Sequence, residues 1–189
     1  YAVVVVGANA SQVSRNWGRW CAKAIAEQFG TDVGGDQGIL VGGWNGRGDG
    51  NLKHTQMPAV LLEPLFASHP QQADLIRSAS GQAILARILV ESIRRFFPQG
   101  GLIAFSVGHK YKTSQPDDRG ADLAGGGSEA DYAELVLKKA AQLLTDEDDK
   151  PGPRKLRLMR GDQLLFETVV DEDAVLSWSP DRNLLFIPD

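Results

Sequence analysis

The chain has 189 residues, a length that suits one domain with a sizeable core. Its formal net charge is −4, with 20 basic and 24 acidic residues, so we expect no nucleic-acid partner, because phosphate binding needs a basic face. The one cysteine, Cys21, excludes an intrachain disulfide. The sequence has no run of about 18 apolar residues, so we predict no membrane span. The opening apolar stretch does not have the pattern of a signal peptide.

Hydrophobic periodicity predicts strands that alternate with helices along most of the chain. The predicted strands cover residues 1–6, 39–41, 59–62, 102–107, 155–159, 164–170 and 184–187, and the predicted helices cover 11–29, 71–97 and 128–144. The first helix is predicted to begin at Ser11 and to stop at Gly30, and Ser128 with Asp131 forms a variant of the capping box at the start of the third. The turn at Gly161-Asp162 indicates a hairpin. Long apolar strands that alternate with helices predict an α/β fold: a single domain over 1–189 with a mostly parallel twisted sheet and helices on both faces.

Ligand sites in such sheets form beyond the carboxyl ends of the strands, which selects Gly7–Asn9, Glu63 and His109. Glu63 ends a buried strand, where desolvation raises the pKa of a carboxyl group and suits it to general acid or base work. His109 is either a metal ligand or general base, or a surface loop residue. Glu129 lies in the first turn of a helix, where acids also serve the helix dipole, but the glycines at 125–127 let a backbone approach closely.

Other features of the sequence carry weaker signals. His54 and His69 flank Glu63 and each alone is best explained as a loop residue. The glycine-rich stretch 31–51, with Trp44, is either a mobile loop or the lining of a groove, and its Arg-Gly-Asp tripeptide is read as a chance match. The Gly7 turn lacks a GxGxxG motif, which makes a dinucleotide site a weak hypothesis.

Several short motifs share one cyclic order. They are Ile103-Ala-Phe-Ser-Val-Gly-His109, Gly120-Ala121, Ser128-Glu129-Ala-Asp, Leu156-Arg-Leu-Met-Arg160-Gly-Asp162, Val4-Val-Val-Gly7-Ala8-Asn9-Ala10-Ser11, Pro58-Ala-Val-Leu-Leu-Glu63-Pro-Leu-Phe66 and a long helix at 82–97. In this order they resemble the third family of zinc-dependent N-acetylmuramoyl-L-alanine amidases, which are cell-wall hydrolases. The family order would read 101–189 and then 1–100, so the resemblance implies a circular permutation joined at Gly100-Gly101.

The resemblance implies a zinc-dependent amide hydrolase that cleaves the N-acetylmuramoyl–L-alanine bond of peptidoglycan. It implies zinc on His109 and Glu129, Glu63 as the catalytic acid and base, and contacts from Asn9 and Trp44 to the substrate. Peptidoglycan would be the partner, and the location would be the cell envelope, the medium outside the cell, or a phage lysis system. The oligomeric state does not follow from the resemblance.

One departure from the family pattern bears on activity. The family's second histidine ligand falls on Gly7, which has no side chain to bind metal, whereas catalytic zinc normally has three protein ligands. His54 or His69 is then the candidate third ligand, or there is none. The alternative is a catalytically impaired module of the same fold that binds peptidoglycan or has a regulatory role. A weaker alternative is another α/β hydrolase or a nucleotide-binding protein that uses the Gly7 turn.

Overall fold

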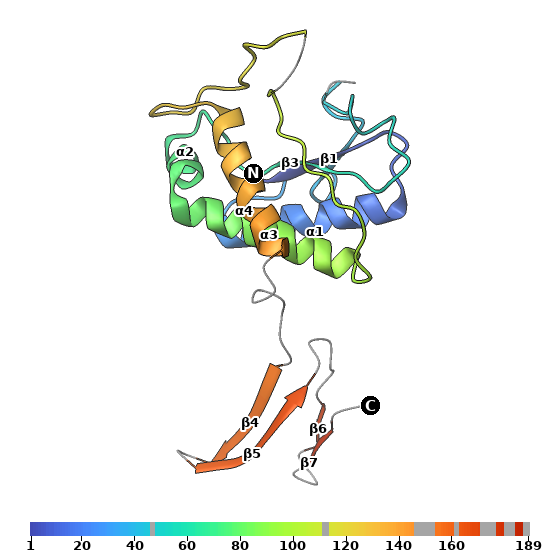
Figure 1. The fold of residues 1–189 in the computed structure, drawn as a ribbon, viewed down its shortest axis with the longest axis vertical. Helices are drawn as coiled ribbons and strands as arrows, with labels where there is room; N and C mark the ends of the chain where they lie inside the picture. The colour runs from blue at the N-terminus through green and yellow to red at the C-terminus, as the bar shows by residue number, and fades with distance from the viewer. Residues whose placement is uncertain are drawn as a thin grey trace. The chain divides into compact units, whose positions relative to one another are not determined.

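The computed structural model describes residues 1–45, 48–110 and 114–145, together with the strands at 154–160, 163–170, 177–179 and 184–186. The chain divides into two compact units, Tyr1–Thr145 and Asp146–Asp189 (Figure 1). Arg47 of the Arg-Gly-Asp tripeptide and the turn at Gly161-Asp162 lie outside the described residues. That the two units act as one amidase-like domain stays a prediction.

The first unit is built on a small mixed sheet of the order β2-β1-β3 (Figure 1). Strand β1 (Val3–Val6) lies in the centre, parallel to β2 (Ile39–Val41) and antiparallel to β3 (Leu61–Glu63). The α/β class is confirmed, but the sheet is small and mixed, with one parallel and one antiparallel pair, where a mostly parallel sheet was predicted. A parallel neighbour needs a crossover, which helix α1 provides between β1 and β2. Between β2 and β3 the described residues form no helix, and β3 pairs antiparallel with β1.

Helix α1 (Gln12–Phe29) confirms the helix predicted over 11–29. The Ser11 side chain accepts a hydrogen bond from the Ser14 backbone N–H and begins the helix, and Gly30 ends it in the left-handed conformation. Gly18 lets the helix approach the sheet closely, because a Cβ there would lie 3.0 Å from Ile39 and 3.2 Å from Val4. Helix α1 is therefore fixed against the central strand.

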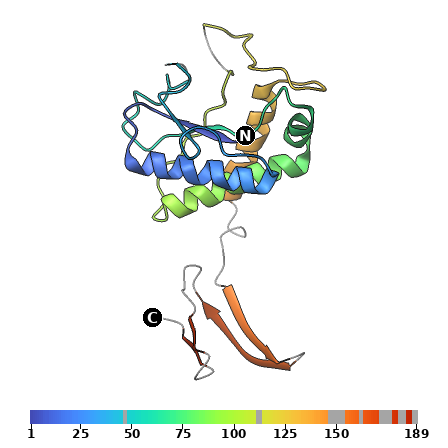
Figure 2. The ribbon, with the colours of Figure 1, turned by 180° about the vertical axis from the view of Figure 1, so that it is seen from behind.

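The helix predicted over 71–97 is two helices, α2 (Pro70–Arg77) and α3 (Ala79–Phe96). Ser78 has extended backbone angles, and its side chain accepts from the Gly81 N–H, so this residue ends one helix and caps the next. Helix α3 packs on α1, and α4 (Glu129–Thr145) packs on α3, so the helices stack on one another (Figures 1 and 2). None of the described helices is long and apolar enough to span a membrane.

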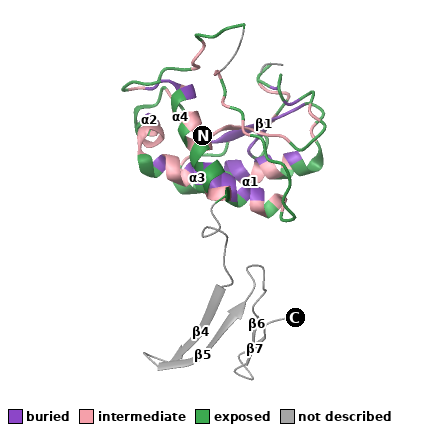
Figure 3. Ribbon diagram, in the orientation of Figure 1, coloured by how far each residue is buried: buried purple, intermediate pink, exposed green. Residues whose placement is uncertain are grey.

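The core of the first unit lies between β1, α1 and α3 (Figure 3). Val4 packs with Cys21 of α1, while Leu89 and Ile93 of α3 pack with Ala140 of α4. Burial raises the pKa of the Cys21 thiol to about 11, opposed by its contact with Ser92, so this cysteine stays a protonated core residue.

The strand predicted over 102–107 is absent from the described structure. Leu102 is 99% exposed and Ile103 38% exposed, and the segment belongs to no ladder. Gly100 and Gly101, with φ of 76° and 139°, direct the chain away from the end of α3. An apolar run forms a strand only where a partner strand accepts its hydrogen bonds, and the periodicity of the run does not specify that partner.

In the second unit, β4 (Arg154–Arg160) and β5 (Gln163–Val170) form an antiparallel ladder, which confirms the predicted hairpin. A β-bulge interrupts the register between Leu158 and Met159. Strands β6 (Ser177–Ser179) and β7 (Leu184–Phe186) pair antiparallel, and only the second of these was predicted. All of the predicted site residues lie in the first unit.

Substitutions of Leu102 and Leu89 test whether the 102–107 segment lies outside the core. We expect Leu102→Ser to change the free energy of unfolding by no more than about 0.5 kcal/mol, because its side chain is already in water. Leu89→Ala should lower it by about 2–5 kcal/mol, because Leu89 is 5% exposed in the core. Urea denaturation measures both, and a large loss in Leu102→Ser would mean that the segment is a core strand.

Candidate functional site

Three of the predicted site residues lie within electrostatic reach of one another. Glu63 ends strand β3, His109 follows the extended segment 101–107, and Glu129 begins helix α4. The His109 Nε2 atom lies 4.0 Å from Glu129 Oε2, and the charges of both residues act on Glu63. Stretches far apart in the sequence therefore build one cluster, which we call the Glu63 site.

The Glu63 carboxyl group has a pKa raised to about 7 from an ordinary value of 4.5. Burial is the largest cause, and the negative charge of Glu129 raises the pKa further, while His109 lowers it. The burial follows from register, because Glu63 pairs with Val3, which is 2% exposed. The prediction that a carboxyl group at this strand end has a raised pKa is confirmed, and the group can gain or lose a proton near neutral pH.

Asp118 holds the ring of His109. Both of its carboxylate oxygens lie 3.1 Å from His109 Nδ1, and Oδ1 also accepts the Gly120 N–H at 3.0 Å. A carboxylate only accepts, so Nδ1 carries a proton, and in the neutral ring Nε2 keeps its lone pair on the side of Glu129. Sequence reasoning missed Asp118. The available signal was a carboxylate in the polar loop that follows a strand-end histidine.

The Gly120-Ala121 pair shapes the position of Glu129. Gly120 has φ of 75°, and a Cβ there would lie 2.6 Å from Glu129 Oε2 and 3.0 Å from the His109 ring, so only glycine fits without a shift. The Ala121 N–H donates to Glu129 Oε2 at 3.2 Å, and the Glu129 N–H donates to the Ala121 carbonyl oxygen at 2.9 Å. This loop therefore fixes both ends of Glu129.

The start of helix α4 is fixed by the predicted pair Ser128 and Asp131. The Ser128 hydroxyl donates to Asp131 Oδ2 at 2.6 Å, and the Ser128 N–H donates to the same oxygen at 3.3 Å. The hydroxyl bond is the main reason that the pKa of Asp131 is lowered. The capping prediction is confirmed, and the first helical turn holds Glu129 toward His109.

His109 and Glu129 fit a divalent cation as a pair. His109 Nε2 and Glu129 Oε2 lie 4.0 Å apart, whereas two ligands of a tetrahedral zinc lie about 3.3 Å apart, so one ion would hold both atoms after the side chains close by about 0.7 Å. A carboxylate behind the other ring nitrogen, as Asp118 provides, is typical of metal-bound histidine. Within the part of the chain that the structure describes, no three His, Cys, Asp or Glu side chains form a metal-binding group.

Gly7 does not reach this cluster. A Cβ at Gly7 would lie 3.2 Å from the Leu52 carbonyl group and 2.9 Å from Asn9 Oδ1, so the space for a side chain is taken. Gly7 also follows Val3, the register partner of Glu63, by four residues, or about 13 Å of strand. A histidine at this position would meet Leu52 instead of the cation pair.

Asn9, His54 and Trp44 lie at the carboxyl end of β1, away from Glu63. The Asn9 side chain donates to the Lys53 carbonyl oxygen at 2.9 Å, which places the exposed His54 beside the carboxyl end of β1. Trp44 is 41% exposed and follows β2 at the same end. His69 is exposed at the start of α2. The structure thus brings Asn9 and His54 to one end of β1 and Glu63 to the other.

Comparisons with known proteins do not identify a family for this chain. No protein-family model, no curated protein and no solved structure matches it. The amidase resemblance therefore depends on the short motifs of the sequence. The positions of Glu63, His109 and Glu129 in the structure do not depend on that resemblance, because they follow from strand register, helix capping and loop geometry.

The raised pKa of Glu63 predicts how stability depends on pH. The folded protein keeps a proton on Glu63 up to a pKa of about 7, whereas the unfolded chain releases it near 4.5. The stabilisation is fully present below pH 4.5 and is lost as the pH rises through 7, a change of about 3 kcal/mol. We expect Glu63→Gln to remove this part of the dependence between pH 4.5 and 8.

Urea denaturation in the presence of a chelator measures this effect. Glu91→Gln is the matched control, because Glu91 is exposed on α3. Equal pH dependence in wild type and Glu63→Gln would mean that Glu63 titrates as an ordinary surface carboxylate.

Proposed function

We propose that the unit Tyr1–Thr145 is a metal-dependent amide hydrolase that acts on the N-acetylmuramoyl–L-alanine bond of peptidoglycan. The observation that carries the proposal is the chain of contacts from Asp118 through His109 to Glu129, with Glu63 beside it. It combines a two-ligand cation position with a proton-transfer group, which amide hydrolysis needs. The bond and the substrate come from the resemblance.

The cation is proposed to be zinc, held by His109 Nε2 and Glu129 Oε2. Bound there, zinc would polarise the amide carbonyl group and lower the pKa of a bound water to about 7. Asp118 accepts from His109 Nδ1, which orients the ring and makes Nε2 a stronger donor to a metal. The Ala121 N–H holds Glu129 Oε2 in place.

Glu63 is proposed to move the proton. Its carboxylate takes a proton from the attacking water, and its carboxylic acid then gives that proton to the nitrogen of the leaving amine. In the metal-free protein the pKa of Glu63 is about 7, so both its acid and its base form are present at neutral pH. Burial raises the pKa of Glu63, and His109 limits the rise by favouring the ionised form of the carboxyl group.

The proposed partner is peptidoglycan, and the proposed location is the cell envelope, the medium outside the cell, or a phage lysis system. A second candidate function is a peptidoglycan-binding module with impaired catalysis. Gly7 favours it, because Leu52 closes the space where the resemblance implies a second histidine. With two protein ligands instead of three, the metal would bind more weakly.

The role of Glu63 is tested by Glu63→Gln, which keeps the size of the side chain and removes its acid–base chemistry. We expect release of peptide from purified muropeptides to fall by about 10²-fold or more. Zinc binding and peptidoglycan pelleting should be retained, and Glu91→Gln should have full activity. Full turnover by Glu63→Gln would remove this residue from the mechanism. A wild-type chain that pellets with peptidoglycan without cleaving it would support the binding module.

The role of Asp118 is tested by zinc affinity, measured by competition with a chromophoric chelator. We expect Asp118→Ala to weaken zinc binding by about 10- to 100-fold, because the His109 ring loses its orienting partner. Asp117→Ala is the matched control, since the neighbouring Asp117 is exposed. Equal affinity in both variants would contradict a zinc position at His109. One zinc per wild-type chain supports the enzyme.

A further inference from the structure

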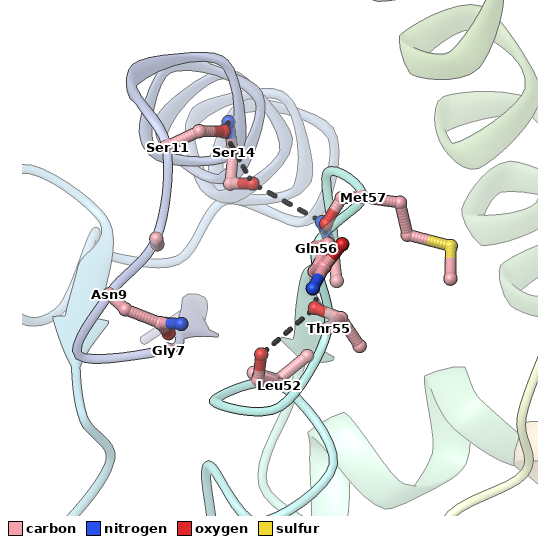
Figure 4. Close-up of a pocket in the computed structure, with 10 residues that line it drawn as sticks. Gly7, Asn9, Ser11, Ser14, Leu52, Thr55, Gln56 and Met57 are labelled. Atoms are coloured by element: carbon pink, nitrogen blue, oxygen red, sulfur yellow. Dashed lines mark hydrogen bonds between the residues drawn. The ribbon is translucent and has the colours of Figure 1, made fainter.

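A second site lies at the opposite end of β1 from Glu63. A pocket of about 310 Å³ opens between the turn that follows β1 and the loop 52–59 (Figure 4). Gly7 follows Val6, whereas Glu63 pairs with Val3, so the length of β1 separates the pocket from the Glu63 site by about 13 Å. The carboxyl end of a strand before a helix is a common place for a ligand in α/β sheets.

The pocket wall is polar and uncharged. Amide and hydroxyl groups come from Asn9, Ser11, Ser14, Thr55 and Gln56, and among the described residues no charged side chain is part of the lining. At the start of α1 the Ser11 side chain already accepts the Ser14 N–H at 3.2 Å, so this donor is not available to an anion. The lining therefore fits a neutral ligand better than a phosphate or a carboxylate.

Two side-chain amides face the space from different segments. Asn9 reaches into the pocket from the turn, with its Nδ2 held by the Lys53 carbonyl oxygen at 2.9 Å and its Oδ1 left as an acceptor (Figure 4). Gln56 lies on the loop side, exposed, and its amide forms no hydrogen bond with the described residues. One acceptor and one free carboxamide match the N–H and C=O groups of a ligand amide.

The hydroxyl groups keep capacity for further bonds. Thr55 Oγ1 donates to the Leu52 carbonyl oxygen at 2.9 Å, which leaves its lone pairs for a ligand hydroxyl group. Ser14 Oγ accepts the Ala59 N–H at 3.2 Å and shares a hydrogen bond with Ser11 Oγ at 3.2 Å, which leaves this hydroxyl group capacity for one further bond. Ala10 and Leu52 add apolar surface for a methyl group. The pocket thus offers partners for an amide, a methyl group and hydroxyl groups together.

We propose that this pocket binds an acetamido sugar, an N-acetylhexosamine unit of a glycan. The volume lies at the lower end of the range of about 300–1,000 Å³ for small-molecule sites, which suits one sugar unit. Sugar binding itself does not depend on the proposed function. Its use does rest on that function: the pocket holds a glycan strand while Glu63 acts on a bond about 13 Å away along β1.

The test is an NMR titration of the labelled full chain with N-acetylglucosamine, glucose and N-acetyl-L-alanine methylamide. We expect N-acetylglucosamine to shift the side-chain amide signals of Asn9 and Gln56 saturably, and glucose to leave them unchanged. Gln56→Ala should weaken binding by about 3- to 10-fold, the loss of one neutral hydrogen bond. Gln28→Ala is the matched control, because Gln28 is exposed near the far end of α1.

Three outcomes would overturn the proposal: no saturable shift, equal shifts with glucose, or tighter binding of the methylamide, which would indicate a peptide site. Glu63→Gln separates this proposal from the proposed function. Sugar binding by wild type and Glu63→Gln alike supports the pocket, even if neither protein cleaves peptidoglycan. Cleavage by wild type without sugar binding supports the hydrolase and overturns the pocket.

Discussion

The antiparallel pairing of β3 with β1 is the constraint on which the Glu63 site depends. It places Glu63 opposite Val3, a residue of the buried central strand, and so removes water from one side of the carboxyl group. A parallel β3 would have carried its last residue to the other end of β1, beside Gly7 and Asn9. The direction of one short strand therefore decides which end of the sheet holds the proton-transfer group and which holds the pocket.

The Glu63 site concentrates negative charge that the fold has to balance. Burial and the negative charge of Glu129 disfavour the ionised form of Glu63, and His109 offsets part of this effect. The surrounding loop leaves little freedom to relax, since Gly120 lies against Glu129 and Asp118 holds His109. In the proposed function a divalent cation between His109 and Glu129 supplies the missing positive charge, so the same repulsion favours metal binding.

The sequence predicted the features that local chemistry controls. The 11–29 helix was found because Ser11 and Gly30 bracket its apolar pattern, and the α4 cap because Ser128 and Asp131 have the right spacing. The raised pKa of Glu63 followed from a carboxylate at the end of an apolar run. The helix ends depend on neighbours within a few residues of chain. The apolar run only marked Glu63 as a candidate, because its burial comes from the pairing with Val3 and part of its shift from Glu129.

The features that the sequence did not predict depend on distant partners. The 102–107 segment has a strand-like pattern, but such a pattern does not specify a partner strand, and the Leu102 side chain is exposed to solvent. Asp118 acts only because the loop folds back on His109, and Leu52 closes the space at Gly7 through a tertiary contact. Ser78 breaks one long apolar pattern into two helices, because a serine inside a helical pattern can also cap a new helix.

The most direct test of the central claim is the titration of the Glu63 side-chain carboxyl carbon by NMR, in the presence of a chelator. The account predicts a pKa of about 7 for Glu63 in the wild-type chain and a lower value in Glu129→Gln, because that substitution removes the neighbouring negative charge. A wild-type value near 4.5 that does not respond to Glu129→Gln would show that Glu63 is solvated and remote from Glu129, and would contradict the account.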